Sequence, residues 1–210
     1  MNTRENRTGG VTVEEGITFA RELEKAGVNV FNVSVGNLVG ESDARVCPGA
    51  EMPDGTYAHL AEAIKHNVSI PVIAVGRIKT PQVAEAILSE GKADLVAIGR
   101  QLIADPYWVE KVATGRQDDI VPCQNCNNCV DSYTTEEGLK CAVNPAAGKE
   151  WTYSVTPAIK AKRVMVIGGG PAGMKAAIVA AKRGHSVVLQ EKERELGGQL
   201  RVAVLPPYKQ

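Results

Sequence analysis

Residues 80–100 read TPQVAEAILSEGKADLVAIGR and contain one complete helix-and-strand unit. The opening Thr-Pro pair is typical of the N-cap and first turn of a helix, and the glycine after Glu90 is typical of its end. The apolar run that follows predicts a strand buried on both faces, as in a parallel sheet. The stretch therefore predicts a helix over 80–91, a strand over 93–99 and a Gly99-Arg100 pair at the end of that strand.

The same alternation occurs twice upstream of this unit. Helices are predicted over 12–26 and 57–67, and strands over 28–36 and 69–76. Thr12 and Glu15 have the spacing of a capping box at the start of the first helix. The sequence thus predicts β/α units over residues 1 to about 115. Three strands cannot close a barrel of eight, so this part is either a small open sheet or the C-terminal part of a larger (β/α)8 TIM barrel.

Two strands of this part end in the same dipeptide. AVGR and AIGR place Gly76-Arg77 and Gly99-Arg100 after the last two predicted strands. A glycine lets backbone N–H groups approach a phosphate, and an arginine adds charge and a planar fork of donors. One such pair is more often a plain strand end with a solvated arginine. Two pairs at equivalent positions favour a phosphate-binding site, as in the loops after strands 7 and 8 of such barrels.

Four of the five cysteines lie close together in the sequence. VPCQNCNNCV places Cys123, Cys126 and Cys129 in a C-x2-C-x2-C run, and Cys141 follows. This three-plus-one spacing favours a [4Fe–4S] cluster. Structural zinc is the main alternative, although it more often takes two separated pairs, and free thiols are the other. Cys47 lies far away in the sequence and is interpreted as an ordinary free thiol.

A second glycine-rich motif begins at Arg163. RVMVIGGGPAGMKAAIVAAKRGHSVVLQEK predicts a strand, a tight turn, a helix and a second strand, the start of a Rossmann-like domain. The turn has the G-x-G-x-x-G form, and an acid stands where it can bind ribose hydroxyls. A later ELGGQL segment adds another glycine turn. The candidate dinucleotide-binding residues are Gly168, Gly170, Pro171, Ala172, Gly173, Glu191 and Gln199.

The composition excludes some classes of function. The charge is balanced, with 24 basic and 24 acidic residues, which argues against an electrostatic partner such as nucleic acid or a membrane surface. No apolar run approaches the roughly 18 residues of a membrane span, and the first ten residues do not form a signal peptide. We therefore expect a cytoplasmic protein. The three histidines (His59, His66 and His185) are interpreted as surface or packing residues.

The order of phosphate site, cysteine run and dinucleotide turn resembles the NADH:flavin oxidoreductases of the old yellow enzyme superfamily that carry an iron–sulfur cluster. Members of this type include 2,4-dienoyl-CoA reductases, trimethylamine dehydrogenase and enoate reductases. The stretch TPQVAEAILSEGKADLVAIGRQLIADPYW is similar to the last barrel segment of the family, and CQNCNNC with CAVNPAAGKE is similar to its cluster signature. The resemblance covers nearly the whole chain.

The resemblance implies an FMN-binding TIM barrel (1–118), an iron–sulfur segment (119–150) and the start of an FAD/NAD(P)-binding domain (151–210). It implies that the two Gly-Arg pairs contact the FMN phosphate, that the four clustered cysteines hold [4Fe–4S], and that the glycine turn with Glu191 binds FAD. Electrons would pass from NAD(P)H through FAD and the cluster to FMN. The substrate would be a small molecule with an activated C=C bond, and the full-length protein can be a homo-oligomer.

Two departures from the family pattern bear on function. Dienoyl-CoA reductases carry a histidine in a loop that corresponds to residues 37–55, which contain none, so an enoate or other enone is an equally good candidate substrate. The resemblance implies that the chain begins at about the fifth barrel strand, so no catalytic acid is assigned and the fragment alone is expected to be inactive. A non-catalytic iron–sulfur electron-transfer module and a zinc-stabilised nucleotide-binding protein remain as alternatives.

Overall fold

The computed structural model describes residues 1–5, 8–36, 46–132, 135–136 and 138–205. The chain divides into two compact units, residues 1–148 and 149–210. Both are mixed α/β structures with parallel strands. Residues 37–45, part of the histidine-free loop 37–55, lie outside the described residues. No described helix has the length and apolar character needed to cross a membrane.

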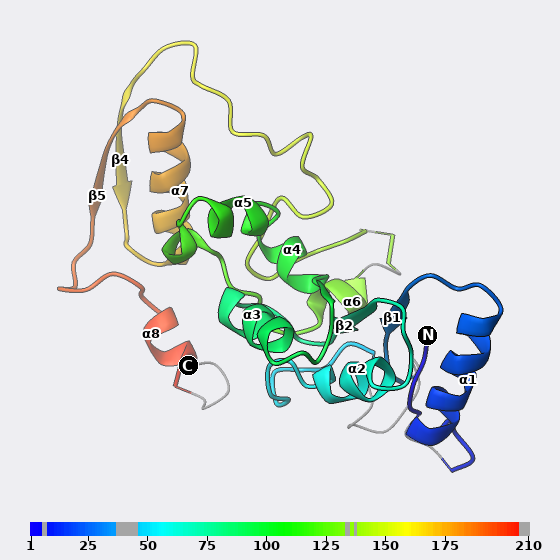
Figure 1. Cartoon of the computed structure of the whole chain (residues 1–210). Helices are drawn as coiled ribbons and strands as arrows, with labels where there is room; N and C mark the ends of the chain where they lie inside the picture. Colours follow the sequence, from blue (N-terminus) through cyan, green and yellow to red (C-terminus); the bar gives the residue numbers. More distant parts are fainter. Residues whose placement is uncertain (6–7, 37–45, 133–134, 137, 206–210) are drawn as a thin grey trace. The chain divides into compact units, whose positions relative to one another are not determined.

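The first unit is built on three parallel strands in the order β1-β2-β3. Figure 1 labels β1 and β2 of this sheet. The strands are β1 (Phe31–Val33), β2 (Val72–Val75) and β3 (Leu95–Ala97), and the helices between and after them are α1 (Val13–Lys25), α2 (Ala58–Lys65), α3 (Pro81–Ser89), α4 (Arg100–Ala104), α5 (Trp108–Ala113), the 3-10 turn η1 (Gln117–Asp119) and α6 (Asn128–Ser132). A parallel bridge between Asn2 and Ser34 adds the N-terminal segment beside β1. Since all strands run the same way, their carboxyl ends lie at one edge of the sheet.

The predicted helices form where their end signals stand. Thr12 accepts a hydrogen bond from the Glu15 N–H while the Glu15 carboxylate accepts one from the Thr12 N–H, so the capping box is present. Gly27 ends α1 with φ of 96°, and its neighbour Val28 donates back to Leu23, as in a Schellman motif. Helix α3 begins at its Thr-Pro pair as predicted.

The strands are shorter than predicted, because strand length depends on pairing with a neighbour and not on apolar character alone. The pairing of β2 with β3 begins at Ile73 and Leu95 and already ends at Val75 and Ala97. Strand β3 is also less covered than a strand buried on both faces, since Leu95 is 49% exposed. Helix α6 lies inside the cysteine segment, where the sequence shows no periodicity.

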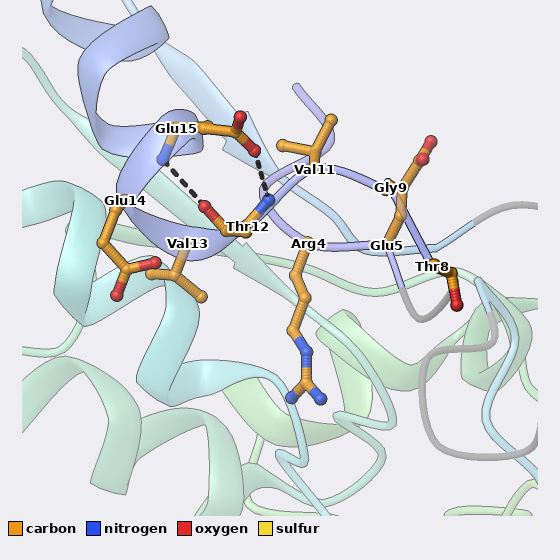
Figure 2. Close-up of a pocket in the computed structure, with 10 residues that line it drawn as sticks. Arg4, Glu5, Thr8, Gly9, Val11, Thr12, Val13, Glu14 and Glu15 are labelled. Carbon is orange, nitrogen blue, oxygen red and sulfur yellow. Dashed lines mark hydrogen bonds between the residues drawn. The ribbon is translucent and has the colours of Figure 1, made fainter.

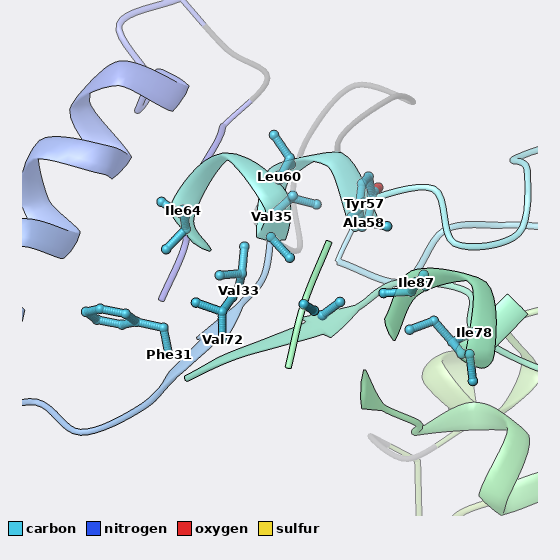
Figure 3. Packing of buried hydrophobic residues seen from close by; sticks show 14 of the residues in the cluster. Phe31, Val33, Val35, Tyr57, Ala58, Leu60, Ile64, Val72, Ile78 and Ile87 are labelled. Carbon is cyan, nitrogen blue, oxygen red and sulfur yellow. The ribbon is translucent and has the colours of Figure 1, made fainter. Parts of the chain in front are cut away.

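The core of the first unit lies between the sheet and α2. Figure 3 shows Val33 and Val72 from the strands beside Ile64 from the helix, and all three side chains are at most 1% exposed. The buried hydrophobic cluster consists of Ala20, Phe31, Val33, Val35, Tyr57, Ala58, Leu60, Ala61, Ile64, Val72, Ala74, Ile78, Ala84, Ile87, Ala93 and Trp108. Burying one such aliphatic side chain contributes about 1.5–3 kcal/mol, so this cluster holds the strand ends that carry the candidate site.

The second unit contains a smaller parallel pair. Strands β4 (Arg163–Ile167) and β5 (Ser186–Gln190) pair along their full length, and α7 (Pro171–Lys182) packs against both. A short helix, α8 (Leu200–Ala203), follows. This is the strand, turn, helix and strand order that the glycine motif predicts.

Candidate functional site

The two Gly-Arg pairs and one cluster cysteine line a single cavity. It has a volume of about 220 Å³ and lies where β2 and β3 end. Its lining includes Gly76, Arg77, Gly99, Arg100 and Cys123, which come from sequence motifs that are separate in the chain. Parallel strands place their carboxyl ends together, and ligand sites commonly form at such an edge. The structure therefore brings the predicted phosphate residues and the first cysteine to one place.

Gly76 must be a glycine for two reasons. Its φ of 123° lies in the region that L side chains rarely adopt. A Cβ on it would also stand 2.6 Å from Cδ2 of Tyr57, a buried ring of the core. Arg77 follows with φ of 54°, so the chain turns sharply where β2 ends. This turn lets the backbone of the Gly-Arg pair face the cavity.

Arg77 is held by two partners in the first unit. Its Nε donates to Asp54 Oδ1 at 2.7 Å, and its Nη1 donates to the carbonyl of Gly49. The Arg77 side chain is 10% exposed and the Asp54 side chain 27%. The guanidinium has five N–H donors, so these bonds occupy part of it and leave further donors for an anion.

Arg100, the first residue of α4, has partners in two other segments. Its Nη1 donates to the Pro48 carbonyl at 2.7 Å and also to Oδ1 of Asn127 in the cysteine segment. Asn127 in turn donates from Nδ2 to the Cys47 carbonyl at 3.0 Å. The arginine of the second Gly-Arg pair is thus also bonded to the loop that carries the cysteines.

Helix α4 holds the start of the cysteine segment through two side chains. Gln101, which is 2% exposed, accepts a hydrogen bond from the Cys123 N–H at 2.8 Å and donates to the Val121 carbonyl at 2.9 Å. Asp105, which is 3% exposed, accepts from the Val121 N–H at 2.9 Å and from Lys111 Nζ at 2.6 Å. These bonds fix the backbone that leads into the first cysteine.

The four clustered thiols influence one another electrostatically. Burial raises the pKa of Cys123, and the neighbouring Cys141 and Cys126 raise it further, while the Asn125 N–H and Arg100 act in the opposite direction. Burial and then Cys123 raise the pKa of Cys129 in the same way. Among the described residues, no group of three or more His, Cys, Asp or Glu side chains stands in an arrangement that could hold a metal ion.

The donor chemistry of the segment nevertheless fits an iron–sulfur cluster. Four thiols supply the usual ligands, and the Asn125 N–H donates to Cys123 Sγ at 3.4 Å, which is the kind of bond that stabilises a thiolate. Asn125 and Asn127 both have positive φ, 50° and 58°, so the chain coils tightly between the cysteines. Arg100 offsets part of the negative charge that thiolates would bring. The same four donors can also hold zinc.

In the second unit, the predicted dinucleotide turn is present and tightly packed. A Cβ on Gly173 would stand 1.9 Å from the Gly168 carbonyl oxygen, so only glycine fits there. Glu191 accepts from the Gly169 N–H at 2.6 Å, and the Gly197 N–H donates to the Gly169 carbonyl at 2.8 Å. The ELGGQL segment therefore lies against the first glycine turn.

The other predicted residues of this unit take defined places. Gly170 is the N-cap of α7, Pro171 and Ala172 form its first turn, and Gln199 is the N-cap of α8. Hydrogen bonds from the backbone N–H groups of Glu193 and Gly169 lower the pKa of Glu191, which favours its ionised form.

A larger hollow, of about 710 Å³, lies near the N-terminus and contains none of the predicted site residues. Figure 2 shows it around the capping box of α1, with Arg4 pointing away from that box. Arg4 stands at the end of the N-terminal segment that runs beside β1, and its carbonyl accepts from the Gly36 N–H. A basic side chain at this edge of the sheet was not predicted, because four residues are too few to show a strand pattern.

Sequence reasoning also missed Gln101, Asp105 and Asn127. Gln101 and Asp105 come directly after the Gly99-Arg100 pair and belong to no motif of their own. Their partners lie in the distant cysteine segment, so the local sequence does not indicate these bonds. One sequence signal could have singled out Asn127. Asparagine is the residue other than glycine that best tolerates positive φ, and Asn127 stands between two cysteines where the chain has to turn tightly.

Comparison with known proteins identifies the family. Residues 3–119 match the NADH:flavin oxidoreductase / NADH oxidase family, and residues 163–210 match the FAD dependent oxidoreductase family. Because the first match covers more than half of the chain, the protein belongs to the NADH:flavin oxidoreductase / NADH oxidase family. This confirms the resemblance that the sequence motifs indicated.

Individual relatives agree with this assignment. An NADH oxidase of Thermoanaerobacter brockii is 50% identical to the chain, and the match covers 96% of this chain and 31% of the relative. A cinnamate reductase of Clostridium sporogenes is 36% identical, and the match covers 95% of this chain and 30% of the relative. A solved complex of 2-naphthoyl-CoA reductase with 2-naphthoyl-CoA superposes with a TM-score of 0.88 at 36% identity, over 99% of this chain and 32% of that one. The chain spans about a third of the length of these relatives.

Proposed function

We propose that the chain is part of a flavin- and iron–sulfur-dependent oxidoreductase that reduces an activated C=C bond. The first unit would be the C-terminal part of an FMN-binding (β/α)8 barrel together with a cluster-binding segment. The second would be the start of an FAD-binding domain. Electrons from NAD(P)H would pass through FAD and [4Fe–4S] to FMN, which supplies the hydride chemistry.

The observation that carries this proposal is the shared cavity at the ends of β2 and β3. Arg77, Arg100 and Cys123 line one space of about 220 Å³, so an anion bound between the arginines would lie next to the first cysteine. A flavin phosphate is an anion of suitable size. Electron transfer between a flavin and a metal cluster requires the two to be close, and this arrangement supports that requirement.

The residues of the chain have distinct roles in this proposal. The backbone of Gly76 and Gly99 and the guanidinium groups of the two arginines would bind the FMN phosphate. Cys123, Cys126, Cys129 and Cys141 would hold the cluster. In the second unit, the N-terminus of α7 would receive the FAD pyrophosphate. Glu191, ionised and beside the turn, would accept hydrogen bonds from ribose hydroxyls.

The relatives support the reaction class. Cinnamate is an α,β-unsaturated acid, and the cinnamate reductase is 36% identical to the chain. The histidine-free segment 37–55 makes an enoate or enone as good a candidate substrate as a dienoyl-CoA. Oxygen is a second candidate electron acceptor, because the NADH oxidase relative is 50% identical.

The test uses protein from the complete reading frame, purified without oxygen. We expect about four iron and four acid-labile sulfide per chain, one FMN and one FAD, and NADH-dependent loss of cinnamate absorbance. Zinc without labile sulfide would support the zinc-stabilised nucleotide-binding alternative. Iron and sulfide without flavin would support the electron-transfer module. NADH-dependent oxygen uptake with no loss of any unsaturated acid would support the oxidase.

A further inference from the structure

Three hydrogen bonds connect Arg100 of the phosphate cavity, the segment 46–49 and the cysteine loop. Arg100 donates to the Pro48 carbonyl at 2.7 Å and to Oδ1 of Asn127, and Asn127 donates to the Cys47 carbonyl at 3.0 Å. Two of the acceptors are consecutive carbonyls of one segment, so the bonds close a ring. The ring connects the end of β3, the segment 46–49 and the loop between the cysteines.

An asparagine suits the central position of this ring better than other residues. Its backbone has φ of 58°, a conformation that asparagine and glycine tolerate best. Its side chain accepts from a guanidinium and donates to a carbonyl at the same time, which only a primary amide of that length can do here. An aspartate could accept but not donate, and a glycine could do neither.

We propose that Asn127 is a positioning residue that couples the cysteine loop to the Gly-Arg phosphate cavity through Arg100. This inference rests on the proposed function, since the two sites are those of FMN and the cluster. Arg100 is a long side chain that loses rotamer freedom when its head group is fixed. If FMN phosphate fixes Arg100 first, the Asn127 bond forms with less further loss of entropy, and the reverse also holds.

The coupling therefore has a definite sign and depends on a definite group. An ordered cysteine loop raises the affinity for FMN, and bound FMN orders the loop by the same factor, because coupling free energies are reciprocal. The effect requires the phosphate, because the proposed site places the phosphate beside the two arginines. Riboflavin, which has the same ring system without phosphate, should bind equally well whether the loop is ordered or not.

The experiment compares flavin affinity with and without the cluster in the full-length protein. FMN and riboflavin dissociation constants are measured by equilibrium dialysis on anaerobic protein, either cluster-loaded or cluster-free after chelation. For the wild type we expect FMN to bind at least about fivefold more tightly when the cluster is present, the low end of usual coupling factors, and riboflavin to show a ratio near one. In Asn127→Gly, which keeps the positive φ, the FMN ratio should also fall to about one.

A second measurement covers the case in which Asn127→Gly takes up no cluster. In cluster-free protein, FMN should slow hydrogen exchange of residues 121–130 in the wild type and not in Asn127→Gly. Asn125→Gly is the matched control. Asn125 has the same backbone conformation in the same loop, but its side-chain oxygen accepts from Cys123 Sγ and not from Arg100. It should keep the FMN-dependent protection.

The outcomes separate this inference from the function on which it rests. Equal FMN ratios in the wild type and Asn127→Gly, or equal protection of the loop in both, would overturn the coupling while leaving the proposed FMN site in place. A ratio as large for riboflavin as for FMN would overturn it too. Absence of any FMN binding to wild-type protein would overturn the proposed function and the coupling with it.

Discussion

Asp105 is the buried charge on which the entry to the cysteine segment depends, and its replacement by asparagine is the sharpest test of the packing. The carboxylate is 3% exposed and accepts from Lys111 Nζ at 2.6 Å, from the Val121 N–H at 2.9 Å and from the Tyr107 N–H at 3.1 Å. The Lys111 side chain is only 15% exposed. Asp105→Asn keeps the shape of the side chain and removes its charge.

The free energy of unfolding that Asp105→Asn loses follows from these contacts. The amide of Asp105→Asn would have one acceptor oxygen in place of two. If that oxygen stays with Lys111 Nζ and the Val121 N–H, the new NH2 group faces the Tyr107 N–H. One unsatisfied buried donor then costs about 1–3 kcal/mol. Removing one partner of a buried ion pair costs about 3–5 kcal/mol in full. Lys111 keeps a bond to the Asp119 carbonyl and some contact with water, so we take the low end, about 3 kcal/mol.

Urea unfolding followed by tryptophan fluorescence measures this change. The chain has two tryptophans: Trp108 is 6% exposed and donates to a carbonyl, whereas Trp151 is 89% exposed, so the signal reports mainly on the first unit. With an m value of about 2 kcal/mol per M, the midpoint should fall by about 1.5 M. Glu110→Gln is the matched control, because its pair with Arg116 is exposed and should shift stability by less than about 0.5 kcal/mol. Equal shifts for the two variants would refute the reasoning.

The same carboxylate gives a pH dependence with a definite direction. Burial by itself raises the pKa of Asp105, but hydrogen bonds from Lys111, Val121 and Tyr107 outweigh it and hold the pKa below its ordinary value. A lowered pKa means that the stabilisation is complete above the unfolded-state pKa of about 3.9 and is lost as the pH falls through the folded-state value. The stability difference between wild type and Asp105→Asn should therefore be constant above about pH 5 and shrink below about pH 4. A difference that grew on acidification would contradict the charge assignment.

Two further predictions use matched pairs of substitutions. Gly173→Ala places a Cβ 1.9 Å from the Gly168 carbonyl oxygen, so it should destabilise the second unit by about 2 kcal/mol and abolish FAD binding. Gly170 has open space around it, so Gly170→Ala should leave the melting temperature unchanged and weaken FAD binding by about tenfold. Calorimetry and flavin content check both variants. A lower melting temperature for Gly173→Ala than for Gly170→Ala, with equal FAD content in the two, would count against the turn as the cofactor site. Cys126→Ser should lower bound iron to less than half of the wild-type amount, and Cys47→Ser should leave it unchanged. Iron loss in the second variant alone would show that the wrong cysteine was assigned.

Local signals in the sequence predicted the helices well because their physics is local. The capping box at Thr12 and the terminal glycines at 27 and 91 act on backbone groups within one turn of the chain, and the structure has all of them. Strand ends were less predictable. An apolar run shows that a segment is buried, but its neighbour decides how many of its residues pair, and the neighbour is distant in sequence. The three core strands are accordingly shorter than their apolar runs.

The candidate site could be predicted only as separate motifs. The glycine-arginine pairs and the cysteine run each had a chemical signature, and the parallel-sheet rule explains why the two pairs meet. The contacts between the Gly-Arg pairs and the cysteine run have no recognisable pattern in the sequence. The bonds of Asn127 to Arg100 and of Cys123 to Gln101 span 27 and 22 residues and depend on where α4 points after the strand ends. Such pairing is a property of the packed fold, not of either segment.

One short segment of the chain serves both proposed cofactor sites. Arg100 faces the phosphate cavity, Gln101 holds the backbone of Cys123, and Asp105 at the end of the same helix holds Val121. Each residue in a helix is rotated by about 100° from the last, so inserting or deleting one residue within α4 would turn its second half away from its partners while the strand end stayed in place. The cysteine loop would then lose its register relative to the cavity. Residues 100–105, which form α4 and its C-cap, therefore hold the cysteine loop in register with the cavity that the Gly-Arg pairs line.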